Sequence, residues 1–216
     1  MMSSLFAQTY IIPRAGVGIS TFAPADNKEN VSSIVGFTGG AAFNVTLTNH
    51  ISIQPEILSI QKGGSYEFES TPGDGILETR NTEVKINYLE IPVLAKYAFG
   101  NGVVKFYVNA GPSVSIGLGG KTDYSLVATI GAGEVIYTDK AKGDVRFGDY
   151  PEESPEQDVY FQNRIDIGAQ FGGGVFIANR VLVDFRYGLG FTKLDDEAQP
   201  KNRTFQVNVA VPLLLF

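Results

Sequence analysis

The stretch NYLEIPVLAKYAFG, residues 87–100, places its side chains in two alternating classes. From Leu89 to Phe99 every odd-numbered residue is apolar or aromatic, while the charges Glu90 and Lys96 are at even-numbered positions. Successive side chains of a β-strand point to opposite faces, so this period predicts a strand with one wholly apolar face and one face that carries charge. Any fold for this chain must therefore give the two faces different surroundings.

Seven further segments alternate in the same way, and no apolar face among the eight contains a charged residue. The other faces are mostly Gly, Ser, Asn and Gln with a few charges. Such a face suits the narrow interior of an eight-stranded barrel, whereas a soluble sandwich points its apolar face inward. Bulk outside and small residues inside favour a membrane barrel over a soluble, lipocalin-like one, because closure removes every strand edge that a bilayer would penalise. The eight segments are residues 11–20, 35–47, 51–58, 87–99, 104–118, 165–177, 181–192 and 204–215.

The connections between these segments alternate between long and short. The long ones are 23–33, 62–82, 119–163 and 193–202, and the short ones are 48–50, 100–102 and 178–180. Outer-membrane barrels have short periplasmic turns at one end and long external loops at the other. The sequence thus predicts an all-β fold: a closed antiparallel eight-stranded up-and-down transmembrane β-barrel, with short periplasmic turns, long external loops and both termini at the short-turn end.

The chain has 216 residues, which suits one all-β domain. We expect residues 10–216 to form this single barrel domain, with a long external loop at about 120–163 that contains a hairpin, YSLVATI and EVIYT, around Gly131-Ala132-Gly133. Residues 1–9 are interpreted either as the remnant of a signal peptide, from Leu5-Phe6-Ala7-Gln8, or as an ordinary frayed N-terminus.

Composition narrows the function further. The net charge of −6 and the pI of about 4.8 argue against nucleic acid as a partner, because phosphate binding needs a basic surface. The chain has no cysteine, which excludes disulfides and thiolate chemistry. No stretch approaches the roughly 18 consecutive apolar residues of a membrane-spanning helix. No cofactor is expected.

The segment NYLEIPVLAKYAF resembles the PorT-like outer-membrane β-barrel family of Gram-negative bacteria, and SIQPEILSIQKGG and YVNAGPSVSIGLGG look like the neighbouring strands of that family. The resemblance implies an exported eight-stranded barrel that the barrel-assembly machinery inserts into outer-membrane lipid. One type of member serves a protein-secretion pathway, so the family does not define one activity. Phe216 fits the terminal aromatic residue that this machinery reads, although it is out of phase with the last strand unless a bulge intervenes.

The charges on the interior faces form the candidate site. Ionised groups in a narrow lumen require partners, so we expect a charge network there, with Glu90 paired to Arg14 or Arg186 and with Lys96 closer to the short-turn end. The network is either a structural plug or a gate for ions or protons; we favour the plug, because eight strands leave little bore. Its members are Arg14, Glu56, Glu90, Lys96, Asp184 and Arg186, and Lys105, Arg164 and Asp166 share their phase.

Enzymatic and metal-binding functions find little support. His50, the one histidine, is in a short turn and lacks a Ser-His-acid neighbourhood. The acidic stretches Asp195-Asp196-Glu197 and Glu152-Glu153 could offer oxygen ligands to calcium, but they lack EF-hand spacing and fit solvated loops better. We therefore predict a non-enzymatic protein with no catalytic or metal site.

Two classes of function stay open at this point. The first is a structural or interaction barrel whose external loops or periplasmic turns contact a protein partner. The second is a small pore or lipid-handling barrel, or a component of a secretion pathway. A wide diffusion porin is disfavoured, because eight strands do not enclose a channel.

Overall fold

The computed structural model describes residues 9–23, 30–73, 75–100, 102–131, 133–151, 155, 157–178, 180–195 and 200–214. Among these residues there is no helix long and apolar enough to cross a membrane. This part of the chain contains twelve strands: β1 Thr9–Ala23, β2 Asn30–Ser32, β3 Ile34–Thr46, β4 Ile51–Gly73, β5 Ile76–Phe99, β6 Val104–Ile130, β7 Glu134–Phe147, β8 Val159–Phe161, β9 Ile165–Ile177, β10 Val181–Gly190, β11 Lys201–Ala210 and β12 Leu213–Leu214.

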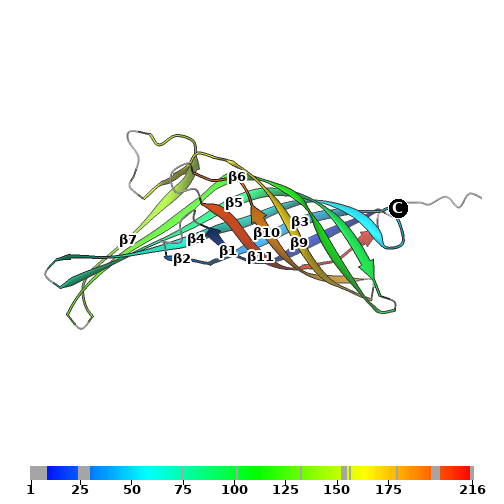
Figure 1. The fold of residues 1–216 in the computed structure, drawn as a ribbon, viewed down its shortest axis with the longest axis horizontal. Helices are drawn as coiled ribbons and strands as arrows, with labels where there is room; N and C mark the ends of the chain where they lie inside the picture. The colour runs from blue at the N-terminus through cyan, green and yellow to red at the C-terminus, as the bar shows by residue number, and fades with distance from the viewer. Residues whose placement is uncertain are drawn as a thin grey trace, which may run out of the picture.

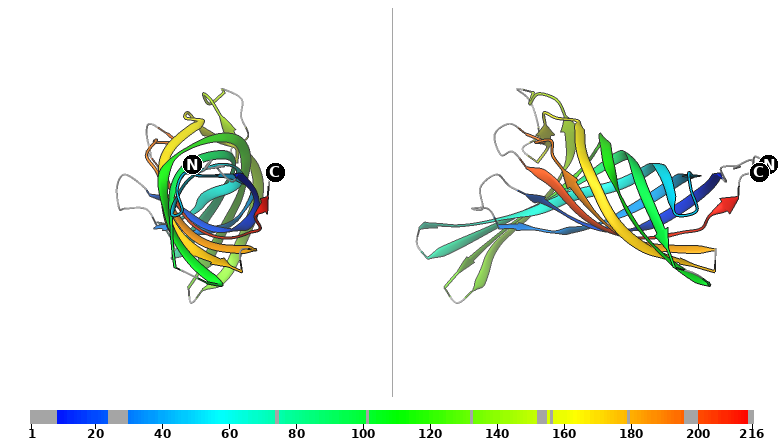
Figure 2. Two further views of the ribbon diagram at one scale, coloured as in Figure 1. Left: turned by 90° about the vertical axis from the view of Figure 1, so that its right-hand side faces the viewer. Right: turned by 45° about the vertical axis from the view of Figure 1, so that its right-hand side comes forward.

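Eight of these strands pair into a ring (Figures 1 and 2). The order around it is β1, β3, β4, β5, β6, β9, β10 and β11, and β11 pairs with β1 again. All of these pairs are antiparallel, and the order follows the chain. Each of the eight predicted segments contributes one strand to the ring. The all-β prediction is thus confirmed, together with its strand count.

The two faces of the ring strands differ as the sequence pattern predicts. Residues of the apolar phase point outward and remain exposed, among them Val17, Phe171 and Phe185 at 44%, 50% and 50%. Residues of the other phase, such as Gln54 and Glu90, are buried inside the ring. Glycine on the interior face lets neighbouring strands approach closely: a Cβ at Gly172 on β9 would lie only 2.1 Å from the carbonyl oxygen of Phe185 on the adjacent β10. The exterior of the ring is therefore apolar, whereas its interior contains buried polar and charged side chains.

Three ring strands, β4, β5 and β6, continue beyond the ring and form a protruding sheet with β7. β4 and β5 stay paired up to Gly73 and Ile76, β5 and β6 up to Ile76 and Ile130, and β6 pairs with β7 from Gly120 onward. Figure 1 shows this extension at the left. The predicted hairpin around residues 131–133 is confirmed as the turn between β6 and β7. The interpretation of 62–82 and most of 119–163 as loops is wrong, because their polar residues are held in strands by cross-strand pairing.

A β-bulge explains why the alternation in β6 ends where it does. Asn87 pairs with Gly119 and Tyr88 pairs with Gly117, so Leu118 is an extra residue that faces outward. Gly119 has a φ of 119°, which favours glycine. After the bulge the buried positions are even-numbered, as at Thr122, whereas before it they are odd-numbered. The strand continues, but its phase reverses.

Cross-strand ion pairs connect β6 and β7 near the start of their pairing. Lys121 lies opposite Asp144 with Nζ 2.5 Å from Oδ1, and Asp123 lies opposite Lys142 at 3.4 Å. The hydrogen bond from Lys121 and its charge lower the pKa of the Asp144 carboxyl. Such exposed pairs add little stability, but opposite charges directly across two strands favour one register.

The predicted last strand, 204–215, is interrupted by proline. β11 ends at Ala210 and β12 begins at Leu213, because Pro212 has no N–H to donate to the ladder. The register with β1 is unchanged across the break, since Arg14 pairs with Ala210 and Ile11 with Leu213. Phe216, the proposed insertion signal, lies outside the described residues, as do residues 1–8.

Apolar clusters occupy both ends of the interior. At the protruding end a cluster packs around the buried Phe22, Tyr88 and Leu194. At the short-turn end a smaller one contains Ile12, Tyr107 and Leu182. The charged residues lie between or beside these clusters.

Candidate functional site: the charges inside the ring

Four interior charges form an arginine–carboxylate quartet: Arg14 on β1, Glu56 on β4, and Asp184 and Arg186 on β10. Arg14 donates to Glu56 at 2.7 Å and to both oxygens of Asp184 at 2.6 and 2.8 Å. Arg186 donates to Glu56 at 2.7 and 2.9 Å and to Asp184 at 3.0 Å. All four residues are at most 6% exposed. Two positive and two negative charges thus balance within the quartet.

Neutral side chains complete the quartet. Gln54 donates to Glu56 at 2.5 Å, Asn208 donates to Asp184 at 3.0 Å, and the Tyr107 hydroxyl donates to Asp184 at 3.2 Å. Every carboxylate oxygen of the quartet accepts at least one hydrogen bond. Buried ions are tolerated when they are paired and hydrogen-bonded in this way. The arrangement links three strands that are far apart in the sequence and holds their register.

A second group of buried polar residues lies closer to the protruding end and is here called the Lys62–Glu90 cluster. Lys62 donates to Glu90 at 2.5 Å, and Ser115 and Gln170 donate to the same carboxylate at 3.0 and 2.8 Å. The Lys62 ammonium also lies 5.3 Å from the centroid of the Tyr88 ring. These residues come from four ring strands, β4, β5, β6 and β9.

The prediction that Glu90 pairs with Arg14 or Arg186 is wrong. Lys62 provides the ion pair instead, while both arginines belong to the quartet. The sequence pattern did not indicate Lys62 as a partner, because this residue begins the segment 62–82 that was expected to be a loop. Its even number could have indicated it: Lys62 follows Glu56 by six residues, so both side chains point to the same, interior side of an extended strand.

Replacing Lys62 with alanine should lower the free energy of unfolding by about 1–3 kcal/mol, because it leaves a buried carboxylate without its cation while Ser115 and Gln170 still donate to it. Urea unfolding in lipid vesicles measures this change. Lys85→Ala is the matched control: Lys85 pairs with Glu83 where both side chains are more than a third exposed, and we expect about 0–1 kcal/mol. Equal effects of the two substitutions would mean that the Lys62–Glu90 pair is solvated.

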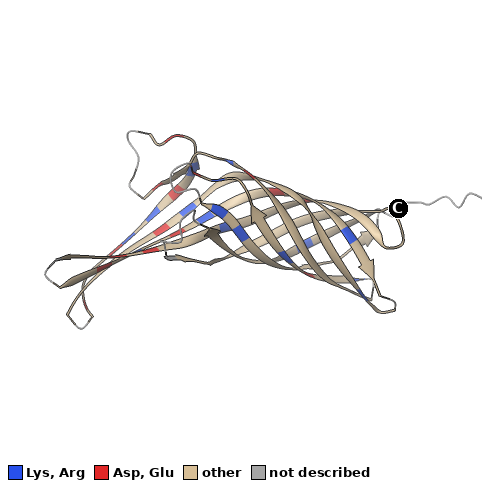
Figure 3. Ribbon diagram, viewed as in Figure 1, with Lys and Arg blue, Asp and Glu red and all other residues tan. Residues whose placement is uncertain are grey.

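Lys96, Asp166 and Arg164 are further charges of the interior phase; Figure 3 marks the basic residues in blue and the acidic residues in red on the ribbon. Lys96 is half-buried toward the short-turn end; its ammonium is 3.9 Å from the centroid of the Tyr107 ring and 3.4 Å from Oε1 of Gln54. Asp166 is buried beside the Lys62–Glu90 cluster and accepts from Asn202 at 2.9 Å. Arg164 donates to the carbonyl of Gly117 at 2.7 Å at an exposed position.

The interior is filled rather than open along this polar stretch. A cavity of about 10 Å³ next to Lys62, Asp166 and Thr204 has room for a single water. Both amide atoms of Gln206 are buried without a hydrogen-bond partner among the described residues. Buried polar atoms of this kind are commonly satisfied by ordered water. The arrangement therefore fits a hydrated plug.

The other candidate residues are not brought together. His50 is exposed in its turn, and its ring lies 5.9 Å from that of Tyr97. Among the described residues no group of three or more His, Cys, Asp or Glu side chains could hold a metal ion. Glu152, Glu153, Asp196 and Glu197 lie outside the described part of the chain.

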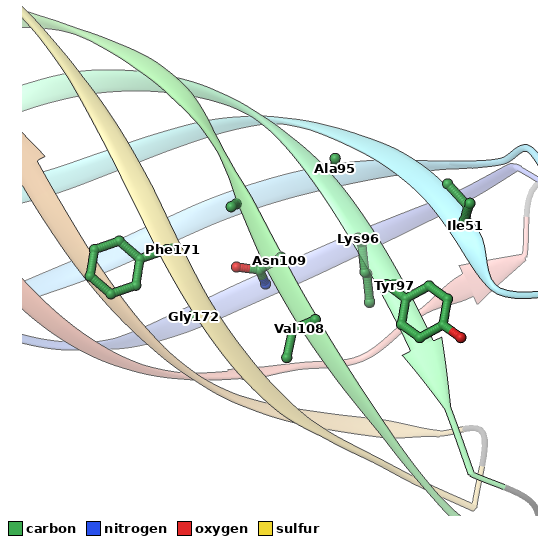
Figure 4. A pocket seen from close by; sticks show the side chains of 9 residues that line it. Ile51, Ala95, Lys96, Tyr97, Val108, Asn109, Phe171 and Gly172 are labelled. Atoms are coloured by element: carbon green, nitrogen blue, oxygen red, sulfur yellow. The ribbon is translucent and has the colours of Figure 1, made fainter.

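A groove of about 660 Å³ lies on the outer surface of the ring (Figure 4). It forms where the small residues Ala95 and Ala110 lie beside the larger Tyr97, Val108 and Phe171. Most of its lining side chains belong to the outward-facing apolar phase. The groove is therefore part of the apolar exterior.

An apolar exterior around a filled, charged interior defines a β-barrel whose exterior is suited to lipid. The chain belongs to the family described as "outer membrane protein beta-barrel domain", whose family model matches residues 6–196. This membership confirms the predicted localisation, the bacterial outer membrane. The family match does not distinguish a PorT-like subfamily from other members of this family.

Several solved structures resemble the chain weakly. Ail, the attachment invasion locus protein of Yersinia pestis, is 13% identical, with 96% of this chain and 99% of that chain covered and a TM-score of 0.39. Neisserial surface protein A is 13% identical, with 93% and 96% covered and a TM-score of 0.43. OprG from Pseudomonas aeruginosa is 8% identical, with 96% of each chain covered and a TM-score of 0.43. Sequence identities and TM-scores this low do not bear on function. No curated protein matches the sequence.

Proposed function

We propose that this protein is a non-enzymatic outer-membrane β-barrel with a structural or interaction role, whose plugged lumen supports a protruding sheet that contacts a protein partner. The short turns and the chain termini face the periplasm, and the protruding sheet is external. The protruding sheet carries the proposal, because the three ring strands that continue past the ring, together with β7, form a surface that a barrel alone does not need.

The outer strand of this sheet has the features of a contact surface. β7 pairs with β6 along one edge, and β8 covers its other edge only at Val145–Phe147. Among the described residues no strand pairs with this second edge between Glu134 and Lys142. Val135, Ile136 and Tyr137 are 58%, 49% and 54% exposed. An open strand edge with apolar side chains is a surface to which another protein can add an extended segment.

A photo-cross-linking amino acid at position 137 tests this role in living cells. We expect a discrete protein adduct from position 137 and none from the matched position 185, because Phe185 is similarly exposed, at 50%, but faces lipid. Adducts are separated by gel electrophoresis and identified by mass spectrometry. The interaction role would be contradicted by protein adducts of equal yield at both positions, or by none at position 137.

The PorT-like assignment and a place in a protein-secretion pathway are part of this proposal. The segment NYLEIPVLAKYAF that carries the resemblance lies on β5, where Glu90 belongs to the Lys62–Glu90 cluster. In this view the motif preserves a strand that positions the plug. Export by a signal peptide, insertion by the barrel-assembly machinery and a Gram-negative source belong to the same proposal. A small pore is less well supported, since the quartet and both apolar clusters fill the interior.

A further inference from the structure

The end of the ring opposite the protruding sheet contains a cavity of about 400 Å³, here called the vestibule. Its wall includes the turn that contains His50, the last residues of β5 and the first residues of β6 and β10. Figure 2 shows this end of the ring, where β12 and the start of β1 also lie. A volume of this size falls within the usual range for small-molecule sites. The proposed function does not involve the vestibule.

Cationic side chains line the vestibule. Lys96 and Lys105 are among its lining residues, and none of the described lining residues is an aspartate or glutamate. Because the whole chain carries −6, a positive cavity stands out against the protein's own charge.

The quartet adds no net charge beside Lys96, because its two cations and two anions balance. All four carboxylate oxygens of Glu56 and Asp184 already accept hydrogen bonds, most of them from the two arginines. The Lys96 ammonium lies 3.9 Å from the centroid of the Tyr107 ring and 3.4 Å from Oε1 of Gln54, and it forms no ion pair within the described part of the chain. An ammonium has three N–H donors, so Lys96 keeps the capacity to donate to a ligand.

The inner end of the vestibule is apolar and closed. Ile12, Leu182 and Tyr107 belong to the apolar cluster at this end of the ring, and Phe176 packs against it. Tyr107 is held in place by its hydrogen bond to Asp184 at 3.2 Å. A ligand in the vestibule therefore meets cations and an apolar wall together, and the quartet behind them blocks its passage.

We propose that the vestibule binds a small amphipathic anion, with its carboxylate or phosphate group at Lys96 and Lys105 and a short apolar stem against Ile12, Leu182 and Phe176. Lys96 acts as a charge-assisted donor that the Tyr107 ring holds in position. The two lysines select for negative charge, and the apolar wall selects against fully hydrated ions.

Calorimetric titration of the purified chain in detergent micelles, with blank micelles subtracted, tests the site. Hexanoate and hexyl phosphate should each saturate one site, whereas hexylammonium should not bind. Lys96→Gln and Lys105→Gln should each weaken binding about ten-fold or more, since a hydrogen bond to a charged group corresponds to at least that factor. Lys96→Arg should retain binding, and Lys121→Gln on the protruding sheet is the matched control that should leave it unchanged.

A cavity-filling substitution provides a second test that leaves the charges in place. Ala98 lines the vestibule, and Ala98→Leu should abolish hexanoate binding by occupying the space. Heat-modifiable gel mobility shows which variants are folded. If the lysine variants do not fold, hexanoate binding by Ala98→Leu becomes the deciding test of the proposal. The proposal is overturned if hexanoate shows no saturable site, if hexylammonium binds equally well, or if folded Ala98→Leu binds like the parent.

The same titration in nanodiscs distinguishes two sources of the anion. If anionic phosphatidylglycerol nanodiscs suppress hexanoate binding and phosphatidylcholine nanodiscs do not, the vestibule takes a lipid headgroup. If binding is equal in both, the ligand is a free anion. Either result requires the site, and neither depends on the partner surface of the protruding sheet.

Discussion

Replacing Glu56 with glutamine should lower the free energy of unfolding by about 3–5 kcal/mol, the usual result of removing one partner from a buried ion pair. Glu56 is 1% exposed and accepts hydrogen bonds from both arginines of the quartet. Without its charge the quartet carries two cations and one anion in a space that water enters poorly. Urea unfolding in lipid vesicles, followed by circular dichroism, measures the loss.

Two further variants make this measurement specific. Glu67→Gln makes the same substitution at an exposed position of the same strand, and we expect a change within about 0.5 kcal/mol. The double variant Glu56→Gln/Arg14→Met restores one cation to one anion and should recover part of the loss. Equal unfolding midpoints for Glu56→Gln and Glu67→Gln would show that the quartet is solvated.

Conductance of the Glu56→Gln variant separates a plug from a gate. A plug loses stability while planar bilayers show no new channel, because the apolar clusters at both ends of the interior remain. A gate opens a pore that is absent from the parent protein. Stepwise conductance in the variant would therefore refute the plug.

Arginine at position 17 should destabilise the folded chain by about 2–4 kcal/mol or prevent its insertion, as charge does on the lipid face of a membrane barrel. Val17 lies near the middle of β1, is 44% exposed, and pairs with Phe37 and Val207, which share its outward phase. Folding into vesicles, followed by heat-modifiable gel mobility, measures the effect.

The matched control places the same charge outside the ring. Val135 on β7 is 58% exposed on the protruding sheet, so Val135→Arg should change the free energy of unfolding by no more than about 0.5 kcal/mol. If Val17→Arg were tolerated as well as Val135→Arg, the outward face of the ring would be in water, and the assignment of the two faces would fail.

Sequence patterns predicted the ring well and the protruding sheet poorly. Strands such as β9, Ile165–Ile177, separate an apolar exterior from a small polar interior, and that contrast is visible at every second residue. In the protruding sheet neither face of β7 between Glu134 and Lys140 is buried, so the residues carry no such contrast. Strand pairing there depends on neighbours that are distant in sequence, which no local pattern reports.

The candidate site shows the same division. The even residue numbers alone predicted which charged side chains face the interior, but not which partners they have. These residues are Arg14, Glu56, Glu90, Asp184 and Arg186. Arg14 and Asp184 are 170 residues apart, and Glu90 pairs with Lys62 only because β4 continues past the point where its apolar alternation ends. Which charges meet depends on the depth of each residue in its strand, and depth follows from the register between strands.

The alternation of residues predicts which side of each ring strand faces outward, because the backbone of an extended strand alternates its side chains whatever its neighbours are. The length of the strands, the reversal of phase at the Leu118 bulge and the division of the buried charges into a neutral quartet and the Lys62–Glu90 cluster depend on how the strands pair in three dimensions. These features result from pairing across the ring, where one hydrogen-bonded register places residues from five or more strands at the same depth.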